Sequence, residues 1–454
     1  MLIPLALAQF ICSFAGTNMN VMISDIAEDL NTTVQGVQIA ITIFLLVMAA
    51  LMIPGGKLTD RWGRKRCFTI GLIIYGIGAL LSAAAPGLGV LILGNSILEG
   101  VGTALLIPPV YILTTMLFTD VTSRARAFGL ISGMGGIGAA MGPLIGGVIT
   151  TAISWRGAFV FQAAIIAVIV VLSRRIVDPV PADPNRQFDI GGAILSAAGL
   201  VLLIAGILSA DNSTVAMVVL LVAGASVLAW FFSYVRARER AGKEPLLSLR
   251  VFRNHTSNVG LITQNVQWLM LMGTSFVVSV FLQVVRGYNA IETGVIFTAS
   301  TLGILLSSLA QARLARMFRQ RTLIVTGFVV TIAGIGVLLA MVNEADSSAW
   351  AFAPGLLLIG LGLGCMLTPS VNIVQSAFPD AQQGEISGLS RSVSNLGSCL
   401  GTAIAGTILV STLTEHAYRA SMIVLAAIGL VGLVAALFLP ADAVQSVPTD
   451  SPNE

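Results

Sequence analysis

Long apolar stretches recur along this chain, each separated from the next by a short polar or charged segment. Reading these stretches against the intervening charges gives about fourteen segments that are long enough to cross a bilayer as an α-helix. The pattern therefore predicts an all-α polytopic membrane protein. The expected spans, in chain order, are Leu2–Ser24, Gly36–Gly56, Phe68–Ala85, Gly89–Leu113, Ala125–Thr150, Trp155–Ser173, Phe188–Ser209, Thr214–Tyr234, Asn258–Val284, Ile291–Ala310, Thr322–Val342, Trp350–Val374, Gly384–Leu413 and Tyr418–Leu439.

The composition supports this class. Hydrophobic residues make up 56% of the chain, charged residues only 10%, and the mean hydropathy is +0.93. The 24 basic and 21 acidic side chains leave a net charge of +3, which is too small for the basic footprint of a nucleic-acid-binding protein. We therefore expect membrane lipids, and no nucleic acid, among the partners.

The distribution of Lys and Arg predicts the orientation, because cytoplasmic loops collect basic residues. With the N-terminus placed inside, the basic residues lie in inward loops except for Arg156, Arg286 and Arg419 outside and Arg391 within a span. This asymmetry predicts a multi-pass protein of the plasma (inner) membrane with both termini in the cytoplasm. We expect Arg391, about two turns from the inner end of its span, to extend toward the cytoplasm.

Two long inward segments, 174–187 and 236–253, flank the seventh and eighth spans. The chain is therefore expected to consist of six helices, an inserted pair and six more helices. The predicted divisions are an N-terminal six-helix half (1–173), a linker with two inserted transmembrane helices (174–253), a C-terminal six-helix half (254–440) and a disordered cytoplasmic tail (441–454).

Four segments carry patterns of a known family. The signature loop, Gly56–Arg66 (GKLTDRWGRKR), matches G-x-L-x-D-R-x-G-R-K, and Gly138–Gly147 (GAAMGPLIGG) matches G-x-x-x-G-P-x-x-G-G. With Glu244–Phe252 and Phe281–Tyr288, these segments make nearly the whole chain resemble the fourteen-helix drug:proton antiporter family of the major facilitator superfamily. The resemblance implies two six-helix halves plus an inserted helix pair, with a central cavity that opens to each side in turn.

The residue types of the signature loop suit an inner gate. Gly56 and Gly63 permit a tight elbow, and Asp60 can accept hydrogen bonds from the N-terminal amides of a helix in the opposite half. The alternative is a plain positive-inside anchor, which explains the basic residues but not the Asp or the glycine spacing. The expected gating residues, including ion-pair partners on the next inward loop, are Gly56, Asp60, Arg61, Gly63, Arg64, Lys65, Asp120 and Arg124.

The fifth span carries small residues on one helical stripe, which let two backbones pack closely and let one helix slide against another. A proline in the same stripe removes a backbone hydrogen bond. We expect a hinge or seal here, and a purely packing role is the alternative. The residues concerned are Gly138, Gly142, Pro143, Gly146 and Gly147.

Glu99 is the carboxylic acid expected nearest the bilayer centre, because it lies about ten residues from the outer end of the fourth span. An ionisable group at that depth is costly unless it faces a cavity or a partner, which favours a role in proton coupling or cation recognition. The alternative is a permanently neutral acid that is hydrogen-bonded within its own half.

Here the chain departs from the family pattern. Ala15 and Ser96 occupy positions that the family usually fills with charged residues, and Glu99 replaces a Gln in the fourth-span pattern R-x-x-Q-G. Glu99 is therefore the expected substitute proton carrier. Asp25, at the outer rim of the first span, is the second candidate.

Polar side chains at intervals of three or four residues mark the faces of several spans that point away from lipid. They predict a substrate cavity, although hydrogen bonds between helices would produce the same stripes. The expected cavity residues are Gln9, Ser13, Thr17, Asn20, Asn95, Glu99, Thr103, Gln264, Gln267, Trp268 and Asn395.

No catalytic or metal-binding pattern is indicated. His255 and His416 lie far apart at span edges, and no phosphate-binding glycine loop with its Lys-Ser/Thr occurs. We therefore expect no enzymatic activity, no use of ATP, no cofactor and no metal. The cysteines lack ligand-type spacing and are expected to be free thiols, mostly buried: Cys12, Cys67, Cys365 and Cys399.

The leading hypothesis is proton-driven export of amphipathic or lipophilic small molecules by a monomer. An exporter or flippase of a specific lipid or endogenous metabolite is the alternative, which the missing first-span acid favours slightly. A third alternative, a non-transporting membrane sensor, is disfavoured by the complete signature loop.

Overall fold

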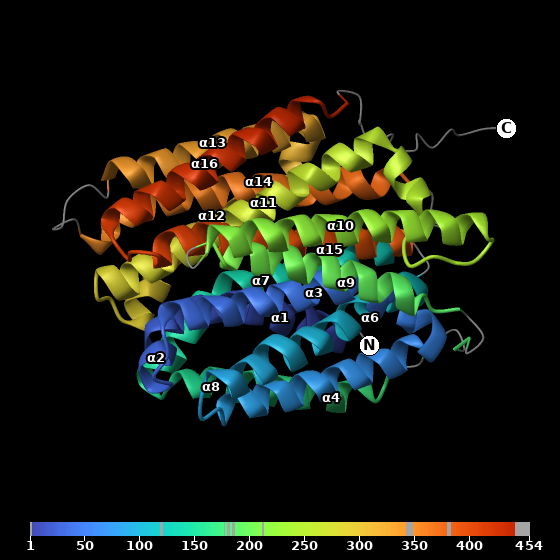
Figure 1. Cartoon of the computed structure of the whole chain (residues 1–454), viewed down its shortest axis with the longest axis horizontal. Helices are drawn as coiled ribbons and strands as arrows, with labels where there is room; N and C mark the ends of the chain where they lie inside the picture. Colours follow the sequence, from blue (N-terminus) through green and yellow to red (C-terminus); the bar gives the residue numbers. More distant parts are fainter. Residues whose placement is uncertain are drawn as a thin grey trace.

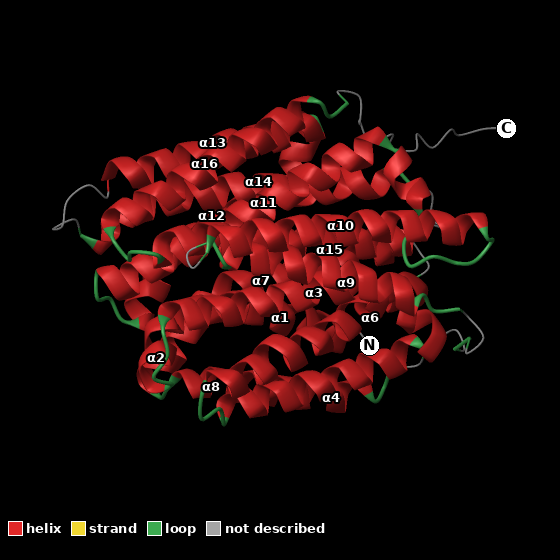
Figure 2. Cartoon of the chain, in the orientation of Figure 1, coloured by secondary structure: helices red, strands yellow, loops and turns green. Residues whose placement is uncertain are grey.

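The helical class predicted from the sequence is confirmed. The computed structural model describes residues 2–118, 121–176, 178, 182–183, 187–210, 213–341, 348–378 and 383–440. Within these ranges the regular structure consists of helices, without a strand (Figure 2). Fourteen of the described helices are long and apolar enough to cross a membrane.

The first six spans come from the N-terminal part of the chain. The first span is α1 (Leu2–Asn18), continued by η1 (Met19–Met22) and α2 (Ile23–Asp29). The fourth is formed by α5 (Leu88–Leu91), the π-helical η2 (Ile92–Glu99) and α6 (Gly100–Leu117). The others are α3 (Val34–Trp62), α4 (Arg64–Ala83), α7 (Val121–Ala152) and α8 (Trp155–Ser173).

The inserted pair is α9 (Ile190–Leu208) and α10 (Thr214–Arg240). After the short η3 (Leu249–Arg253), the second set begins with α11 (His255–Val280), which η4 (Phe281–Val285) extends. The remaining elements are α12 (Ala290–Met317), α13 (Gln320–Met341), η5 (Ala349–Ala351), α14 (Phe352–Ser376), α15 (Gln383–Val410) and α16 (Glu415–Leu437).

Twelve of the fourteen spans pack as two six-helix sets that lie side by side (Figure 1). In the first set, α1 packs along α7, and α4 packs along α6 and α8; in the second, α11 packs along α15, and α14 along α12 and α13. The two sets meet where α3 contacts α15 and where α7 contacts α12. The inserted helices α9 and α10 pack on each other, and α9 also contacts α3 and α15.

Several helices extend beyond the spans expected from hydropathy. The largest difference concerns the signature loop, where we expected the span to end at Gly56 and an elbow to follow. Instead α3 continues through Pro54 and Gly56 as far as Trp62, and Gly63 alone separates it from α4. Gly63 has a φ of 91°, a conformation that favours glycine. Hydropathy marks where apolar side chains end, whereas a helix continues until its backbone hydrogen bonding is broken.

Glycines on α7 allow the close helix packing expected of this span. A β-carbon added at Gly142 would lie 2.0 Å from Thr17 Oγ1 on α1, and one added at Gly147 would lie 2.5 Å from the Ala290 carbonyl oxygen on α12. One stripe of α7 therefore contacts its own set at α1, and another contacts the second set. The predicted hinge role of these glycines and of Pro143 stays a prediction.

Candidate functional site

A cavity of about 40 Å³ lies between the two six-helix sets, where α1, η1 and α7 meet α11 and α12. Pockets for drug-sized ligands enclose roughly 300–1,000 Å³, so this conformation has room for a few water molecules rather than a substrate. The lining mixes small polar and apolar side chains: Thr17, Asn20, Ser275, Ser300, Thr301, Ala139, Ala140, Pro143, Leu271, Met272, Phe297 and Ile304.

Two of the predicted first-span residues reach this cavity. The Thr17 hydroxyl donates to the Ala139 carbonyl oxygen at 3.0 Å, and so ties α1 to α7. The backbone carbonyl of Asn20 accepts from Gln283 Nε2 at 2.8 Å and from the Ser279 hydroxyl, both in the second set. Thr17 and Asn20 therefore line the cavity at a junction between the two sets.

Gln9 belongs to a second junction, and sequence reasoning missed its partner. Its amide nitrogen donates to Ser13 Oγ at 3.2 Å, and its amide oxygen accepts from the Tyr111 hydroxyl at 3.2 Å. Tyr111 in turn accepts a hydrogen bond from Arg391 of α15, whose guanidinium lies 4.8 Å from the centre of the tyrosine ring. The phenol ring and hydroxyl of Tyr111 therefore hold the Arg391 guanidinium at the junction of the two sets, and its extension toward the cytoplasm stays a prediction.

The predicted residues of α11 and α15 divide into two groups. Both polar atoms of the Gln264 side chain bond α15: the nitrogen donates to Ser394 Oγ and the oxygen accepts from the Ser390 hydroxyl, each at 2.9 Å. It therefore joins two helices. Gln267 is buried and neither of its amide atoms is hydrogen-bonded to a described residue, whereas Trp268 and Asn395 are half-buried. Gln267 retains its full capacity to bind a polar group.

Glu99 is completely buried inside the first set and does not line the cavity described above. Tyr75 of α4 lies beside its carboxyl group, and Cys12 of α1 and Thr103 are close by. Neither carboxyl oxygen of Glu99 makes a hydrogen bond of normal length and angle with the described residues. A carboxylate without such bonds is costly to bury, so Glu99 can lose its proton only if it gains hydrogen bonds or contact with water.

The other predicted positions near Glu99 on the fourth and first spans carry uncharged side chains. Asn95 donates to the sulfur of Met19 at 3.4 Å, and Ser96 donates to the Ala40 carbonyl oxygen at 2.7 Å. Ala15 is buried in the core. Asp25 is half-buried in α2, at the end of the bundle opposite the signature loop. Glu99 is thus the acid enclosed within the described part of the fourth span.

The signature loop forms its hydrogen bonds with nearby segments. Arg64 Nη2 lies 3.1 Å from Asp60 Oδ1, one turn away, and the Asp60 carbonyl oxygen accepts from the amide of Asp183. The carboxylate that caps a helix here is Asp178, which accepts from the amides of Arg64 and Lys65 at 2.7 and 3.1 Å. Asp120 and the side chain of the predicted gating residue Arg124 lie outside the described residues.

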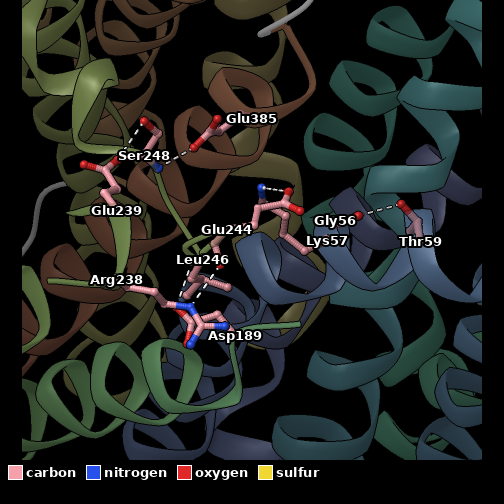
Figure 3. A network of polar contacts seen from close by, with 10 residues as sticks. All are labelled: Gly56, Lys57, Thr59, Asp189, Arg238, Glu239, Glu244, Leu246, Ser248 and Glu385. Atoms are coloured by element: carbon pink, nitrogen blue, oxygen red, sulfur yellow. Dashed lines mark hydrogen bonds and ion pairs between the residues drawn. The ribbon is translucent and has the colours of Figure 1, made fainter. Parts of the chain in front are cut away.

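A strap, residues 241–248 between α10 and η3, crosses the same end of the bundle, and sequence reasoning missed its contacts (Figure 3). Lys57 Nζ of α3 lies 3.0 Å from Glu244 Oε1. Farther along the strap, the amide of Ser248 donates to Glu385 Oε1 of α15 at 2.5 Å, and its hydroxyl donates to Glu239 Oε1 at 3.0 Å. The strap is therefore bonded to both six-helix sets.

A buried carboxylate anchors the strap to the inserted helices. Asp189 accepts hydrogen bonds from the amides of Gly192 and Leu246 at 2.9 and 3.0 Å and from the Tyr234 hydroxyl at 3.1 Å. Arg238 Nε lies 3.6 Å from its second oxygen. These bonds fix the strap relative to α9 and α10.

Comparisons with known proteins agree with this architecture. A family model described as the Major Facilitator Superfamily matches residues 5–402 and 266–453. The chain is 31% identical to puromycin resistance protein pur8 of Streptomyces alboniger, over 92% of this chain and 83% of that protein. It is 25% identical to multidrug resistance protein Stp of Mycobacterium tuberculosis, over 92% and 78% of the two chains.

Solved structures extend the agreement to the fold. A crystal structure of the peptide transporter POT in complex with sulfate superposes with a TM-score of 0.71 at 16% identity, and covers 96% of this chain and 94% of that one. The family match over most of the chain, the relatives and this fold confirm the resemblance carried by the signature loop. The chain belongs to the major facilitator superfamily, a family of membrane transporters.

Proposed function

We propose that the chain is a multidrug-type exporter of amphipathic small molecules that works by alternating access and is driven by protons. The signature loop, the strap and both termini are cytoplasmic in this proposal, and the membrane is the plasma membrane. Relatives named as puromycin and multidrug resistance proteins support export of such compounds. The distribution of basic residues supports the orientation.

The observation that carries the proposal is the small cavity between two six-helix sets that are tied together at both ends. At the end opposite the signature loop, Gln283 bonds Asn20, and the amide of Ile291 donates to Thr151 Oγ1 at 3.2 Å. At the signature end, the strap bonds α3 and α15. A substrate of drug size can enter only if one end opens, which is what alternating access requires.

The chemistry around the cavity favours amphipathic substrates. Its lining consists of hydroxyl, amide and apolar side chains, without a charged group. The amide of Gln267, buried on α11 without a hydrogen bond among the described residues, is a candidate for a polar contact when the cavity widens. Such a site would bind lipophilic compounds through surface burial and orient them through a few polar contacts.

Glu99 supports the coupling part of the proposal. It is a fully buried acid whose oxygens lack regular hydrogen bonds to the described residues, and the chain has no charge at Ala15 or Ser96 to take its place. A group of this kind can exchange a proton only when a conformational change admits water. Proton release can therefore be tied to the opening of one end.

Sealed proteoliposomes that contain a pH dye test this proposal. Lipophilic cations and neutral amphipathic drugs should each produce a proton flux opposite to their own movement. Uptake of fluorescent lipid across the bilayer without proton flux would support a lipid flippase instead. Binding of the same compounds without any flux would support a sensor.

A further inference from the structure

Three completely buried polar side chains meet inside the first six-helix set, away from the cavity between the sets. They are Glu99 of η2, Tyr75 of α4 and Gln162 of α8. The Tyr75 hydroxyl donates to Gln162 Oε1 at 2.5 Å, and its oxygen lies beside the Glu99 carboxyl group. The amide nitrogen of Gln162 has no hydrogen bond among the described residues. The three groups form a chain from Gln162 through Tyr75 to Glu99.

The positions of the hydrogens in this row of hydrogen-bonding groups determine whether it suits a protonated or an ionised Glu99. A tyrosine hydroxyl carries one hydrogen, and in this structure that hydrogen is given to Gln162. The Tyr75 oxygen can then only accept from Glu99, and a carboxyl group can donate only when it is protonated. The arrangement therefore matches a protonated Glu99.

The same chain can run in the opposite direction. If the Gln162 amide turns over, its nitrogen donates to the Tyr75 oxygen, and the Tyr75 hydrogen becomes free to point at Glu99. An ionised carboxylate, which can only accept, would then receive a charge-assisted hydrogen bond. Each group keeps its own hydrogens in this change, and only the proton of Glu99 is released.

We propose that Tyr75 and Gln162 are positioning residues for the coupling proton: they give Glu99 an acceptor while it holds its proton and a donor after it has lost it, by reversing two hydrogen bonds. The inference rests on the proposed coupling role of Glu99. The unpaired amide nitrogen of Gln162 is the group that the reversed chain would use.

The surroundings of Glu99 leave few other groups for this role. The Cys12 thiol of α1 is a second titratable neighbour, and it lies beside Thr103. In α3, which also packs on η2, the charged residues are Lys57, Asp60 and Arg61, all in its last two turns. In α4, the charged residues are Arg64, Lys65 and Arg66, at its first three positions. The segments α5 and α6 carry no charged residue.

The test uses Tyr75→Phe and Gln162→Leu in the full-length protein, with Tyr418→Phe as a matched control. Tyr418 is also completely buried, and its hydroxyl makes no hydrogen bond with the described residues. Proton-driven export is measured against pH. Tyr75→Phe removes the donor that the ionised carboxylate would use, so the midpoint of the profile should move to higher pH by about one unit. Gln162→Leu leaves the Tyr75 hydroxyl in place and removes only the amide that fixes its direction, so its midpoint should change by less than that. The control should keep the wild-type midpoint.

Infrared difference spectra provide a readout that folding defects do not imitate. The carbonyl band of protonated Glu99 is identified as the band that Glu99→Gln removes. This band should shift in Tyr75→Phe, because the acid has lost its acceptor, and should not shift in Tyr418→Phe. An unchanged band and an unchanged pH midpoint in both Tyr75→Phe and Gln162→Leu would overturn the inference.

The outcomes separate this inference from the proposal beneath it. If Glu99→Gln stops coupled export while both positioning variants behave as wild type, only the inference fails. If Glu99→Gln still exports substrate against the substrate's concentration gradient when a pH difference drives it, the coupling role fails and the inference fails with it.

Discussion

Lys57 and Glu244 form an ion pair of 3.0 Å that joins the last turns of α3 to the strap. The pair is partly exposed, with 22% and 36% of the two side chains accessible, so its own contribution is modest. Its position matters more than its strength. Because the strap also bonds Glu385 of α15, the pair completes a bridge between the two six-helix sets at the proposed cytoplasmic end.

Charge reversal at this pair should favour opening of the proposed cytoplasmic end. In Glu244→Lys, repulsion from Lys57 replaces attraction, which we expect to cost the closed form about 1 kcal/mol, roughly a fivefold change in the ratio of closed to open. Spin labels across that end would report longer distances. The double variant Lys57→Glu/Glu244→Lys restores the attraction, and its failure to restore the closed population would exclude a role for the pair.

Asp189 should be the strongest single anchor of the strap. Its buried carboxylate accepts three hydrogen bonds, and Asp189→Ala would leave the amide of Leu246 and the hydroxyl of Tyr234 without their acceptor. We expect a loss of about 2–3 kcal/mol in local stability, seen as faster hydrogen exchange in residues 241–248. Tyr234→Phe removes one donor only and should have a smaller effect. Equal exchange in wild type and Asp189→Ala would refute the anchoring role.

Asp60→Asn should impair transport while leaving substrate binding largely intact. The substitution removes the charge that pairs with Arg64 at 3.1 Å, within the turn between α3 and α4. We expect label pairs across the proposed cytoplasmic end to shift toward the inward-open population. Thermal unfolding close to that of wild type is the control, and unchanged label distances would remove Asp60 from the gate.

Gly142 should be essential for the packing of α7 on α1. An alanine β-carbon would lie 2.0 Å from Thr17 Oγ1, whereas one at Gly136 of the same helix would meet nothing within 4 Å. Gly142→Ala should therefore lower the transport rate at least several-fold by separating the two helices, and Gly136→Ala should not. Similar rates in the two variants would show that this contact is not needed for transport.

The sequence predicts the fourteen helices well because each is a long apolar stretch, and hydropathy measures that property directly. It does not predict where a helix ends in water. The structure places residues 57–62 in α3, although their charges indicate a loop. Helix geometry continues there because nothing interrupts its backbone bonds before Gly63.

The site was less accessible to sequence reasoning. Glu99 could be identified because one carboxylic acid in the middle of an apolar span is enough to mark a candidate proton-binding site. The partners of such residues could not, because Tyr75, Gln162 and Tyr111 meet them only through the packing of helices far apart in the chain. A polar side chain inside an apolar stretch was the available signal for Gln162, and Tyr75 carries none that distinguishes it from other core aromatics.

In the proposed mechanism, Glu99 carries the proton that drives export. The direct measurement is uphill export of a lipophilic cation from Glu99→Gln vesicles under an imposed pH difference, because the amide keeps the shape of the acid but cannot titrate. We predict that the variant still binds the cation, with an affinity that no longer depends on pH, and that the pH difference drives no accumulation. Accumulation at the wild-type level would show that Glu99 does not carry the coupled proton.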